Sequence, residues 1–251
     1  DEPPDSGWWR GRGLETTCLF DITVDPTNSN NVYFGFYDEG FHKSTDGGTT
    51  FKNTTFKNRD RLQYVNNVFN ILVDPESPNI IYATSGWWHE SHGDVIKSVD
   101  YGETWTVIGH EATGLPDAWT YSLALDSSSP VYTRTLYVTS YGYGVYKSTA
   151  GGASWAAVNN GLGTNGNWCV SSLAMHPSDP NVLYAGVDMQ GMHWLEESDR
   201  YGGIYKTTNG GLQWSQVDTG IPDVCSLAVN PQDSQTLYAG VREHYHHVNQ
   251  E

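Results

Sequence analysis

The stretch Lys43-Ser44-Thr45-Asp46-Gly47-Gly48-Thr49-Thr50-Phe51 returns three more times in this 251-residue chain, with conservative changes. The four copies, which we call the boxes, span 43–51, 97–105, 147–155 and 206–214. Their first hydroxyl residues stand at positions 44, 98, 148 and 207, a period of about 50 residues. Self-similarity at such a period indicates a repeat architecture, in which each repeat is one structural unit.

The box has the composition of a tight hairpin turn. An Asp carboxylate can accept hydrogen bonds from backbone N–H groups two residues on, and Gly permits a positive φ. The first hydroxyl can tie the two sides of the turn together, and the last aromatic can pack between neighbouring sheets. Ala150 and Asn209 replace the Asp in two copies, so the turn must form there without a carboxylate. We therefore predict a structural, non-catalytic role for Ser44, Asp46, Gly48, Phe51, Ser98, Asp100, Gly102, Trp105, Ser148, Gly152, Trp155, Thr207, Asn209, Gly211 and Trp214.

Two short apolar runs precede each box, a third strand enters it and a fourth leaves it. Four strands in about 50 residues predict an all-β fold, a β-propeller of four-stranded antiparallel blades. Almost no helix is expected, because no long segment shows a 3.6-residue apolar period. We predict a lead-in at 1–17, blades at about 18–66, 67–118, 119–168 and 169–222, and a partial blade at 223–251. Such a set is expected to be part of a larger, seven-bladed ring, completed by the same longer chain or a partner chain; a closed five-bladed ring is the alternative.

The boxes resemble the Asp-box (BNR) repeats of sialidases, sortilin-like (VPS10) propellers and xyloglucanases. The wording of the first repeat, from Asp25-Pro26 through Val32-Tyr33-Phe34-Gly35 to the box, is most similar to glycoside hydrolase family 74. The lead-in Gly13-Leu14-Glu15-Thr16-Thr17 is similar too. This resemblance implies two tandem seven-bladed propellers, an endo-β-1,4-glucanase or xyloglucan hydrolase activity, and a catalytic pair with one carboxylate in each propeller.

The composition limits the partners and the cellular location that are expected for this protein. The net charge of −16 argues against a nucleic-acid partner, and no apolar stretch is long enough to cross a membrane. Three Cys residues do not make a disulfide framework, and buried free thiols are favoured over a Cys169–Cys225 disulfide. Few Lys and abundant Gly and Trp fit an extracellular or cell-surface protein. We predict no cofactor and no metal site.

The Trp residues are distributed unevenly between the two faces that the blade template predicts. Turns between strands one and two, and the boxes between strands three and four, share one side of a blade, which we call the box face. The other turns and the links between blades share the opposite face. Apart from three box residues, the Trp residues fall in opposite-face segments or the lead-in: Trp8, Trp9, Trp87, Trp88, Trp119, Trp168 and Trp194. Aromatics gathered on one rim predict a binding surface, here for sugar rings, although some could plug the channel or pack between blades. The predicted ligand-binding residues are Trp87, Trp88, Trp119, Trp168, Trp194, His89 and His193.

Glycoside hydrolysis needs carboxylates beside such aromatics. The resemblance implies that a catalytic Asp follows the second strand of an early blade, before a Gly and an aromatic. Asp38 and Asp188 match this context, although the shared repeat template alone could place an Asp there. Sialidase activity is disfavoured, since the Arg residues are too scattered to grip a sialic carboxylate. Two functions stay open: a secreted hydrolase of polysaccharide, and a non-catalytic propeller that binds protein or glycan through the same loops.

Overall fold

The computed structural model of the chain describes residues 9–10, 18–55, 67–86, 92–163, 169–188, 202–218, 221 and 223–241. The first sheet contains β1 (Trp9–Arg10), β2 (Leu19–Val24), β3 (Val32–Phe36), β4 (Gly40–Ser44) and β5 (Thr50–Asn53). The second contains β6 (Asn67–Val73), β7 (Ile81–Gly86), β8 (Val95–Ser98) and β9 (Thr106–Gly109). The third contains β10 (Thr120–Asp126), β11 (Thr135–Ser140), β12 (Gly144–Ser148) and β13 (Ala156–Ala157). The fourth contains β14 (Val170–Met175), β15 (Leu183–Val187), β16 (Gly203–Thr207) and β17 (Trp214–Asp218), and the fifth β18 (Val224–Val229) and β19 (Leu237–Val241).

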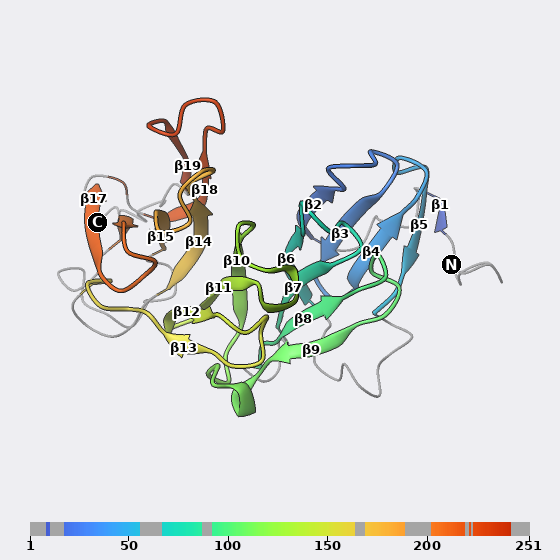
Figure 1. The fold of residues 1–251 in the computed structure, drawn as a ribbon. Coiled ribbons are helices and arrows are strands. Elements are labelled where there is room, and N and C mark those ends of the chain that lie inside the picture. Colours follow the sequence, from blue (N-terminus) through green and yellow to red (C-terminus); the bar gives the residue numbers. More distant parts are fainter. Residues whose placement is uncertain are drawn as a thin grey trace, which may run out of the picture.

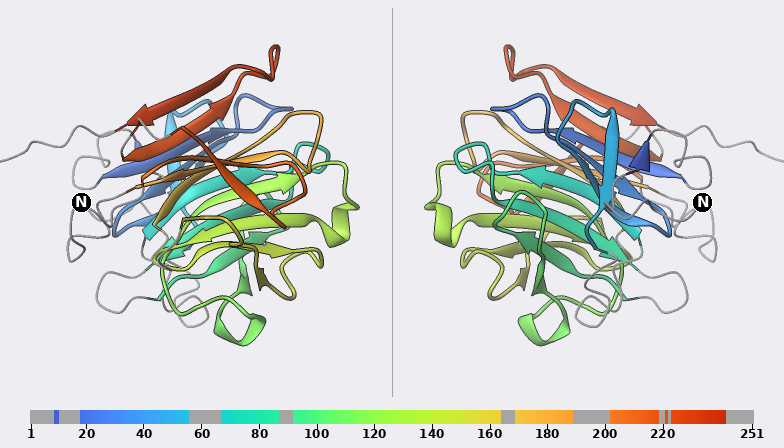
Figure 2. Two further views of the ribbon diagram at one scale, coloured as in Figure 1. Left: turned by 90° about the vertical axis from the view of Figure 1, so that its left-hand side faces the viewer. Right: turned by 90° about the vertical axis from the view of Figure 1, so that its right-hand side faces the viewer.

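The sheets are the blades of a β-propeller, as the sequence predicted. Figure 1 shows them fanned in chain order in an arc, with the first strands β2, β6, β10, β14 and β18 side by side toward the middle. Figure 2 shows the strands of all blades running between the same two sides of the molecule. In the described ranges the only helical turns are η2 (Glu111–Thr113) and η3 (Val131–Thr133), which confirms the expectation of almost no helix.

The lead-in adds a strand to the first blade. β1 pairs antiparallel with β5, so it lies at the outer edge of that sheet, with Trp9 opposite Phe51. The fifth blade is described only as the hairpin of β18 and β19.

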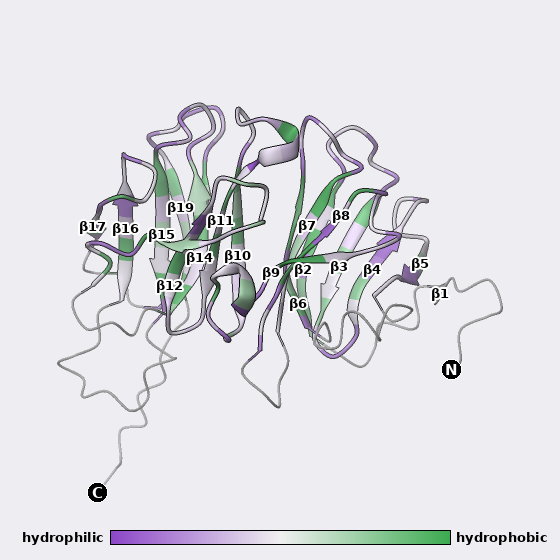
Figure 3. Ribbon diagram, turned by 60° about the horizontal axis from the view of Figure 1, so that its bottom comes forward, coloured by the Kyte–Doolittle hydropathy of each residue, from purple (hydrophilic) through white to green (hydrophobic). Residues whose placement is uncertain are grey.

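The hydrophobic core lies between consecutive blades. Phe41 of the first blade packs with Val68 and Ile81 of the second, and similar clusters join the second to the third and the third to the fourth. Figure 3 shows the hydrophobic residues concentrated along the strands, with hydrophilic residues at the turns. A blade can therefore bury these hydrophobic residues only where a neighbouring blade packs against it.

The boxes close hairpin turns, but the carboxylate acts differently from our prediction. The Ser44 hydroxyl accepts from the Gly48 N–H (2.9 Å) and donates to Asp46 (2.7 Å). Asp46 Oδ1 accepts from the N–H groups three and four residues on, Thr49 and Thr50, and not from the residue two positions on. Gly48 has a φ of 88°, as predicted, and its counterparts in the other boxes are also positive. In the copy with Ala150, the Ser148 hydroxyl still accepts from Gly152 N–H.

The box Trp residues pack between sheets, as predicted. The Trp105 ring meets Phe41 of the preceding blade edge-on, with centroids 4.6 Å apart, and its indole N–H donates to Thr54. The indole N–H groups of Trp155 and Trp214 donate to the carbonyls of Ile108 and Val158, each in the preceding blade. These three boxes therefore join their blades to the one before. Phe51, at the same position in the first box, packs instead within its own blade, against Phe34.

A buried ion pair joins the second and third blades. Arg134, with an exposure of 0%, donates from Nε to Asp74 Oδ2 (2.7 Å) and from Nη2 to Asp74 Oδ1 (2.9 Å) and Glu76 (2.9 Å). Its remaining nitrogen donates to the carbonyls of Ser127 and Ser129. Hydrogen bonds from the guanidinium to Asp74 raise the pKa of Arg134 despite burial, so the guanidinium stays charged.

All three cysteines are free thiols. Cys169 is a buried free thiol, as expected, whereas Cys225 is only partly buried; Cys18 is exposed. Burial raises the pKa of Cys169 to about 11.

Breaking the Arg134 pair should destabilise the propeller strongly. Removal of one partner of a buried ion pair typically costs about 3–5 kcal/mol, because the other charge is left without compensation. We expect this loss in the free energy of unfolding for Arg134→Met, measured by chemical denaturation. The double variant Asp74→Asn/Arg134→Met removes both charges and should recover part of the loss. A single variant as stable as the parent would contradict this role.

Candidate functional site

Backbone hydrogen bonds define the two faces of the propeller. On the box face, the boxes bond to the turn between strands one and two: Gly47 N–H donates to Asn30, and Gly210 N–H donates to Asn181. On the opposite face, the residue after the second strand bonds to the start of the first strand, as Tyr141 N–H does to Trp119. In the described ranges, the start of the first strand and the turn after the second strand therefore lie together on the opposite face.

Six aromatic side chains form a continuous row on the opposite face. The row, which we call the aromatic row, consists of Tyr37, Phe20, Phe69, Tyr121, Trp119 and Tyr141 and crosses the first three blades. Ring centroids are 5.9 Å apart for Phe20 and Tyr37, 4.9 Å for Phe20 and Phe69, and 4.7 Å for Phe69 and Tyr121. Trp119 lies 6.3 Å from Tyr121 and 5.8 Å from Tyr141. Phe20, with 47% of its surface exposed, is the most open of the hydrophobic residues in the row.

A β-bulge near the start of each first strand positions this row. The pairing of β2 with β3 shifts between Leu19 and Asp21, and that of β6 with β7 shifts between Val68 and Asn70. The displaced residues are Phe20 and Phe69, and Tyr121 lies in the corresponding shift of β10. A bulge bends its strand and re-aims a side chain, often beside a functional site. The sequence analysis predicted Trp residues in loops and did not predict these three aromatics. The repeat places an aromatic residue near the start of the first strand in each of the first three blades, and this regularity could have indicated them.

The candidate carboxylate Asp188 lies beyond the third-blade end of the row. It follows β15, and its N–H donates to the Cys169 carbonyl (2.9 Å). Burial raises the pKa of Tyr141, and Cys169 and Asp188 raise it further. Burial is the main cause of the raised pKa of Tyr121, and Asp188 adds to it, so Asp188 lies near this end of the row.

The candidate carboxylate Asp38 lies at the other end of the row. It occupies the turn between β3 and β4, is exposed, and has a φ of 65°. Its N–H donates to Asn67 Oδ1 at 2.6 Å, which ties this turn to the second blade. Burial is the main cause of the raised pKa of Tyr37, and Asp38 adds to it. Asp tolerates this left-handed backbone conformation better than most residues do.

A third carboxyl group, Asp94, lies on the same face beside two histidines. Burial raises its pKa to about 6, against the opposing effects of His110 and His92. His92 Nδ1 contacts Asp117 in the link to the third blade. A side chain at Gly93 would overlap the Ala118 carbonyl, so residues 92–94 lie tightly against the link that carries Trp119. A carboxyl that holds its proton near pH 6 has the property that a general acid needs.

Of the ligand-binding residues predicted from the sequence, the structure places Trp119 in the aromatic row. Trp87, Trp88, Trp168, Trp194, His89 and His193 lie outside the described residues, as does Trp8. Among the described residues, no group of three or more His, Cys, Asp or Glu could hold a metal ion. No helix in the described ranges is long and apolar enough to cross a membrane.

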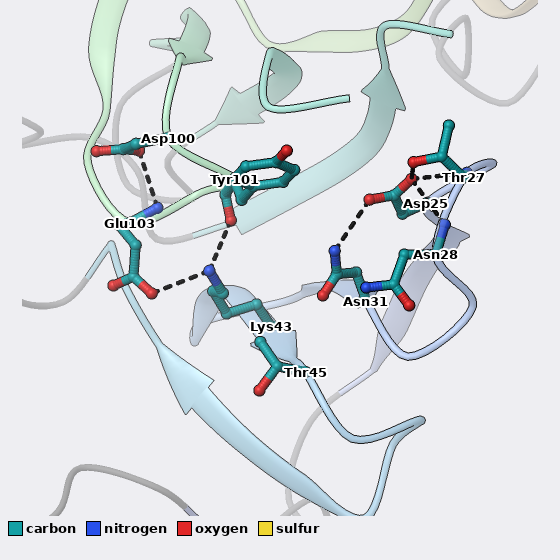
Figure 4. Close-up of a pocket in the computed structure, with 9 residues that line it drawn as sticks. All are labelled: Asp25, Thr27, Asn28, Asn31, Lys43, Thr45, Asp100, Tyr101 and Glu103. Carbon is teal, nitrogen blue, oxygen red and sulfur yellow. Dashed lines mark hydrogen bonds and ion pairs between the residues drawn. The ribbon is translucent and has the colours of Figure 1, made fainter. Parts of the chain in front are cut away.

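A hollow on the box face was not predicted. It lies between the first and second blades, has a volume of about 380 Å³, and is lined by Asp25, Thr27, Asn28, Asn31, Lys43, Thr45, Asp100, Tyr101 and Glu103 (Figure 4). Its lining is polar and charged, unlike the aromatic row.

Comparison with known proteins finds similar propellers among glycoside hydrolases. No sequence model of a protein family matches the chain. It is 28% identical over 177 residues to a xyloglucanase of Acetivibrio thermocellus, which covers 60% of this chain and 20% of the relative. It is 27% identical over 244 residues to a probable oligoxyloglucan-reducing end-specific xyloglucanase of Neosartorya fischeri, covering 87% of this chain and 28% of the relative.

Among solved structures, a glycoside hydrolase family 74 (GH74) xyloglucanase from Xanthomonas campestris superposes with a TM-score of 0.67 at 16% identity, over 88% of this chain and 35% of that one. The chain is therefore an all-β propeller. More particularly, it is a propeller similar to those of GH74, and it spans only 13% to 28% of the length of the curated relatives that it matches.

The raised pKa of Asp94 predicts a pH-dependent stability. The carboxyl titrates near 3.8 in an unfolded chain and near 6 in the folded protein, so between these values the folded state binds more protons. The free energy of unfolding should therefore fall as the pH rises from about 4 to about 6. Asp94→Asn, which is neutral at every pH, should be more stable than the parent above pH 6 and equally stable below about pH 4.

Thermal unfolding followed by circular dichroism across this pH range tests the prediction. Asp233→Asn is the matched control, since it removes a carboxylate from an exposed turn of the fifth blade. A stability difference for Asp94→Asn that does not change with pH would refute the prediction.

Proposed function

We propose that the aromatic row binds a β-1,4-glucan chain such as xyloglucan, and that this chain is part of a secreted, GH74-like polysaccharide hydrolase. The observation that carries the proposal is the row itself: six contiguous aromatic side chains on one face, with Phe20 and Tyr37 extending a compact group of four across three blades. Aromatic faces suit the C–H faces of sugar rings, and an elongated row suits a polymer more than a compact ligand. The xyloglucanase relatives support the same substrate class.

The positions of the carboxylates support at most one catalytic group among the two predicted. Asp38 and Asp188 lie in the first and fourth blades, with two whole sheets between them. Packed sheets are about 10 Å apart, whereas an inverting pair needs carboxyl groups roughly 6.5–9.5 Å apart. We therefore propose that one of them acts with a carboxylate from another part of the protein. Asp188, beside Tyr121 and Tyr141, is the better placed of the two.

The second candidate is a non-catalytic extracellular propeller, sortilin-like or a surface scaffold, that binds protein or glycan on the same face. It needs no second carboxylate from another part of the protein, whereas the hydrolase does. The two candidates differ in whether a bound glycan is cleaved.

Loss of an aromatic ring should weaken glycan binding. We expect Phe20→Ala and Trp119→Ala each to lower the affinity for a xyloglucan oligosaccharide by about tenfold, or roughly 1.4 kcal/mol, measured by calorimetry. Tyr132→Ala is the control, because Tyr132 is 90% exposed in the turn between the first and second strands of its blade, on the box face. Unchanged affinity in both row variants would remove the row from the binding surface.

Hydrolysis is tested by release of reducing ends from xyloglucan and mixed-linkage glucan. We expect release to be abolished by Asp188→Ala or by Asp38→Ala, and to be unaffected by Asp126→Ala in a box-face turn. Asp94→Ala tests the third carboxyl in the same assay. Binding without release by the parent chain would mean either a non-catalytic propeller or a second carboxylate that lies outside this chain. Release that survives every substitution would overturn the catalytic assignments.

A further inference from the structure

The turn after the second strand follows one backbone template in the first and third blades. The N–H groups of Tyr37 and Tyr141 each donate to the carbonyl just before the first strand of their own blade, at 2.9 and 2.8 Å. The next residues, Asp38 and Gly142, both have a positive φ, 65° and 76°, and therefore occupy the same template position. Asp188, whose N–H makes the equivalent bond in the fourth blade, corresponds to Tyr37 rather than to Asp38.

Asp38 occupies a backbone conformation that suits Gly better. A Cβ at Gly142 would meet open space, so the positive φ, and not crowding, is what favours Gly in the third blade. An L residue is strained in this conformation, Asp less so than most. Such strained residues cluster at functional sites, where the surrounding structure holds them. Because Gly142 closes the same turn, the turn does not need the exposed carboxylate of Asp38.

In both turns a side chain of the next blade accepts a hydrogen bond from the N–H group of this residue. Asp38 N–H donates to Asn67 Oδ1 at 2.6 Å. Burial is the main cause of the raised pKa of Cys169, and a hydrogen bond from the Gly142 N–H to its sulfur opposes it. Asn67 and Cys169 each stand two residues before the bulge of their strand, so they too are equivalent.

Asn67 supplies a stronger acceptor than the cysteine does, and it carries an unused donor. Only 1% of its surface is exposed, and the bond to Oδ1 fixes the orientation of the amide. The Nδ2 group is buried and has no hydrogen-bond partner among the described residues. An enclosed donor without a partner is unfavourable, and a cysteine at this position would accept the N–H without it. The stability of the fold therefore does not explain the asparagine.

A second asparagine holds the other side of the same turn. Asn53, at the end of β5, donates from Nδ2 to the Glu39 carbonyl at 2.5 Å. The hydroxyl of Thr55 accepts from the Phe41 N–H at 3.2 Å, just beyond the turn. The backbone around Asp38 is therefore held from its own blade and from the second blade, while the carboxylate stays exposed.

We propose that Asn67 is a positioning residue, which holds the strained backbone of Asp38 and so fixes the direction of its carboxylate at the Tyr37 end of the aromatic row. The inference rests on the proposed function, in which this carboxylate contacts the bound glycan. Asn67 is buried and acts through Asp38, without touching the glycan itself. This role is the same whether Asp38 takes part in cleavage or only in binding.

Hydrogen exchange of the Asp38 amide, measured by NMR on the whole chain, tests the contact itself. We expect exchange about tenfold faster in Asn67→Ala than in the parent, because the N–H group loses its acceptor. Asn67→Cys reproduces the fourth blade and should give an intermediate rate. Asn30→Ala is the matched control, since it removes an amide from an exposed box-face turn and should leave this rate unchanged. Equal rates in the parent and in Asn67→Ala would overturn the assignment.

Release of reducing ends from xyloglucan separates positioning from a purely structural role. We expect Asn67→Ala to lower kcat about tenfold with KM within about twofold of the parent, because only the direction of the carboxylate is lost. Asn67→Cys should recover part of kcat. If the parent binds an oligosaccharide without release, the affinity replaces kcat, and Asn67→Ala should weaken binding as Asp38→Ala does. Parent-like values for Asn67→Ala beside impaired Asp38→Ala would overturn the proposal.

Failure of the proposed function would look different. Parent-like values for both Asn67→Ala and Asp38→Ala would remove Asp38 from the site, and the positioning role would fall with it. A parent that neither binds nor cleaves xyloglucan would contradict the proposed function, and the exchange rates would still decide whether Asn67 holds Asp38.

The variant Asp38→Gly reproduces the turn of the third blade and keeps the bond to Asn67. It should melt within about 3 °C of the parent, because relief of the strain offsets the extra freedom of Gly in the unfolded chain. It should lose activity or affinity as fully as Asp38→Ala does. Melting far below the parent would assign the carboxylate to the fold and overturn the proposal. If Asn67→Ala fails to fold, Asn67→Cys decides: exchange and kcat equal to those of the parent would contradict the role of the amide.

Discussion

The bulge in each first strand is the constraint on which this propeller depends, because a bulge leaves a backbone N–H outside the ladder. In this propeller a side-chain oxygen of the preceding blade accepts a hydrogen bond from that N–H group. Ile71 N–H donates to Asp21 (2.6 Å), Leu123 N–H to Asn70 Oδ1 (2.8 Å), and Leu173 N–H to the Ser122 hydroxyl (3.0 Å). A buried N–H without a partner costs about 1–3 kcal/mol, so a bulged blade needs a neighbour in register.

The same bulge links stability to the candidate site. The residue that it displaces is the one that joins the aromatic row, and the residue that follows it bonds to the next blade. A change in register would therefore break the contacts between blades and turn Phe20 or Phe69 away from the opposite face at once. In the fourth and fifth blades the displaced residues are Ser171 and Cys225, so the same backbone device continues where the aromatics stop.

The repeats made the fold predictable, because four boxes at a regular period leave few architectures for short alternating strands. The details of the candidate site were harder to predict from the sequence. Phe20 and Phe69 look like ordinary members of apolar runs, since an alternating pattern does not show where a strand bulges. The Arg134–Asp74 pair joins residues 60 positions apart and follows from the angle between blades, which the pattern does not give. Asp46 was predicted to bond two residues on, whereas the turn brings the N–H groups three and four residues on to its carboxylate.

A repeat protein can gain function by changing single positions of a template whose backbone is already fixed. At the position of Arg134 the other blades carry Asn30, Asn79 and Asn181, and all four carbonyls accept from the box of their own blade. The backbone bond therefore does not depend on the side chain, which is free to vary. Where the side chain is Arg, it forms an ion pair with Asp74 of the preceding blade; where it is Asn79, it donates to the Val99 carbonyl of its own blade, and Asn31 donates to Asp25 instead. One backbone template therefore carries either an ion pair between blades or polar contacts that stay within each blade.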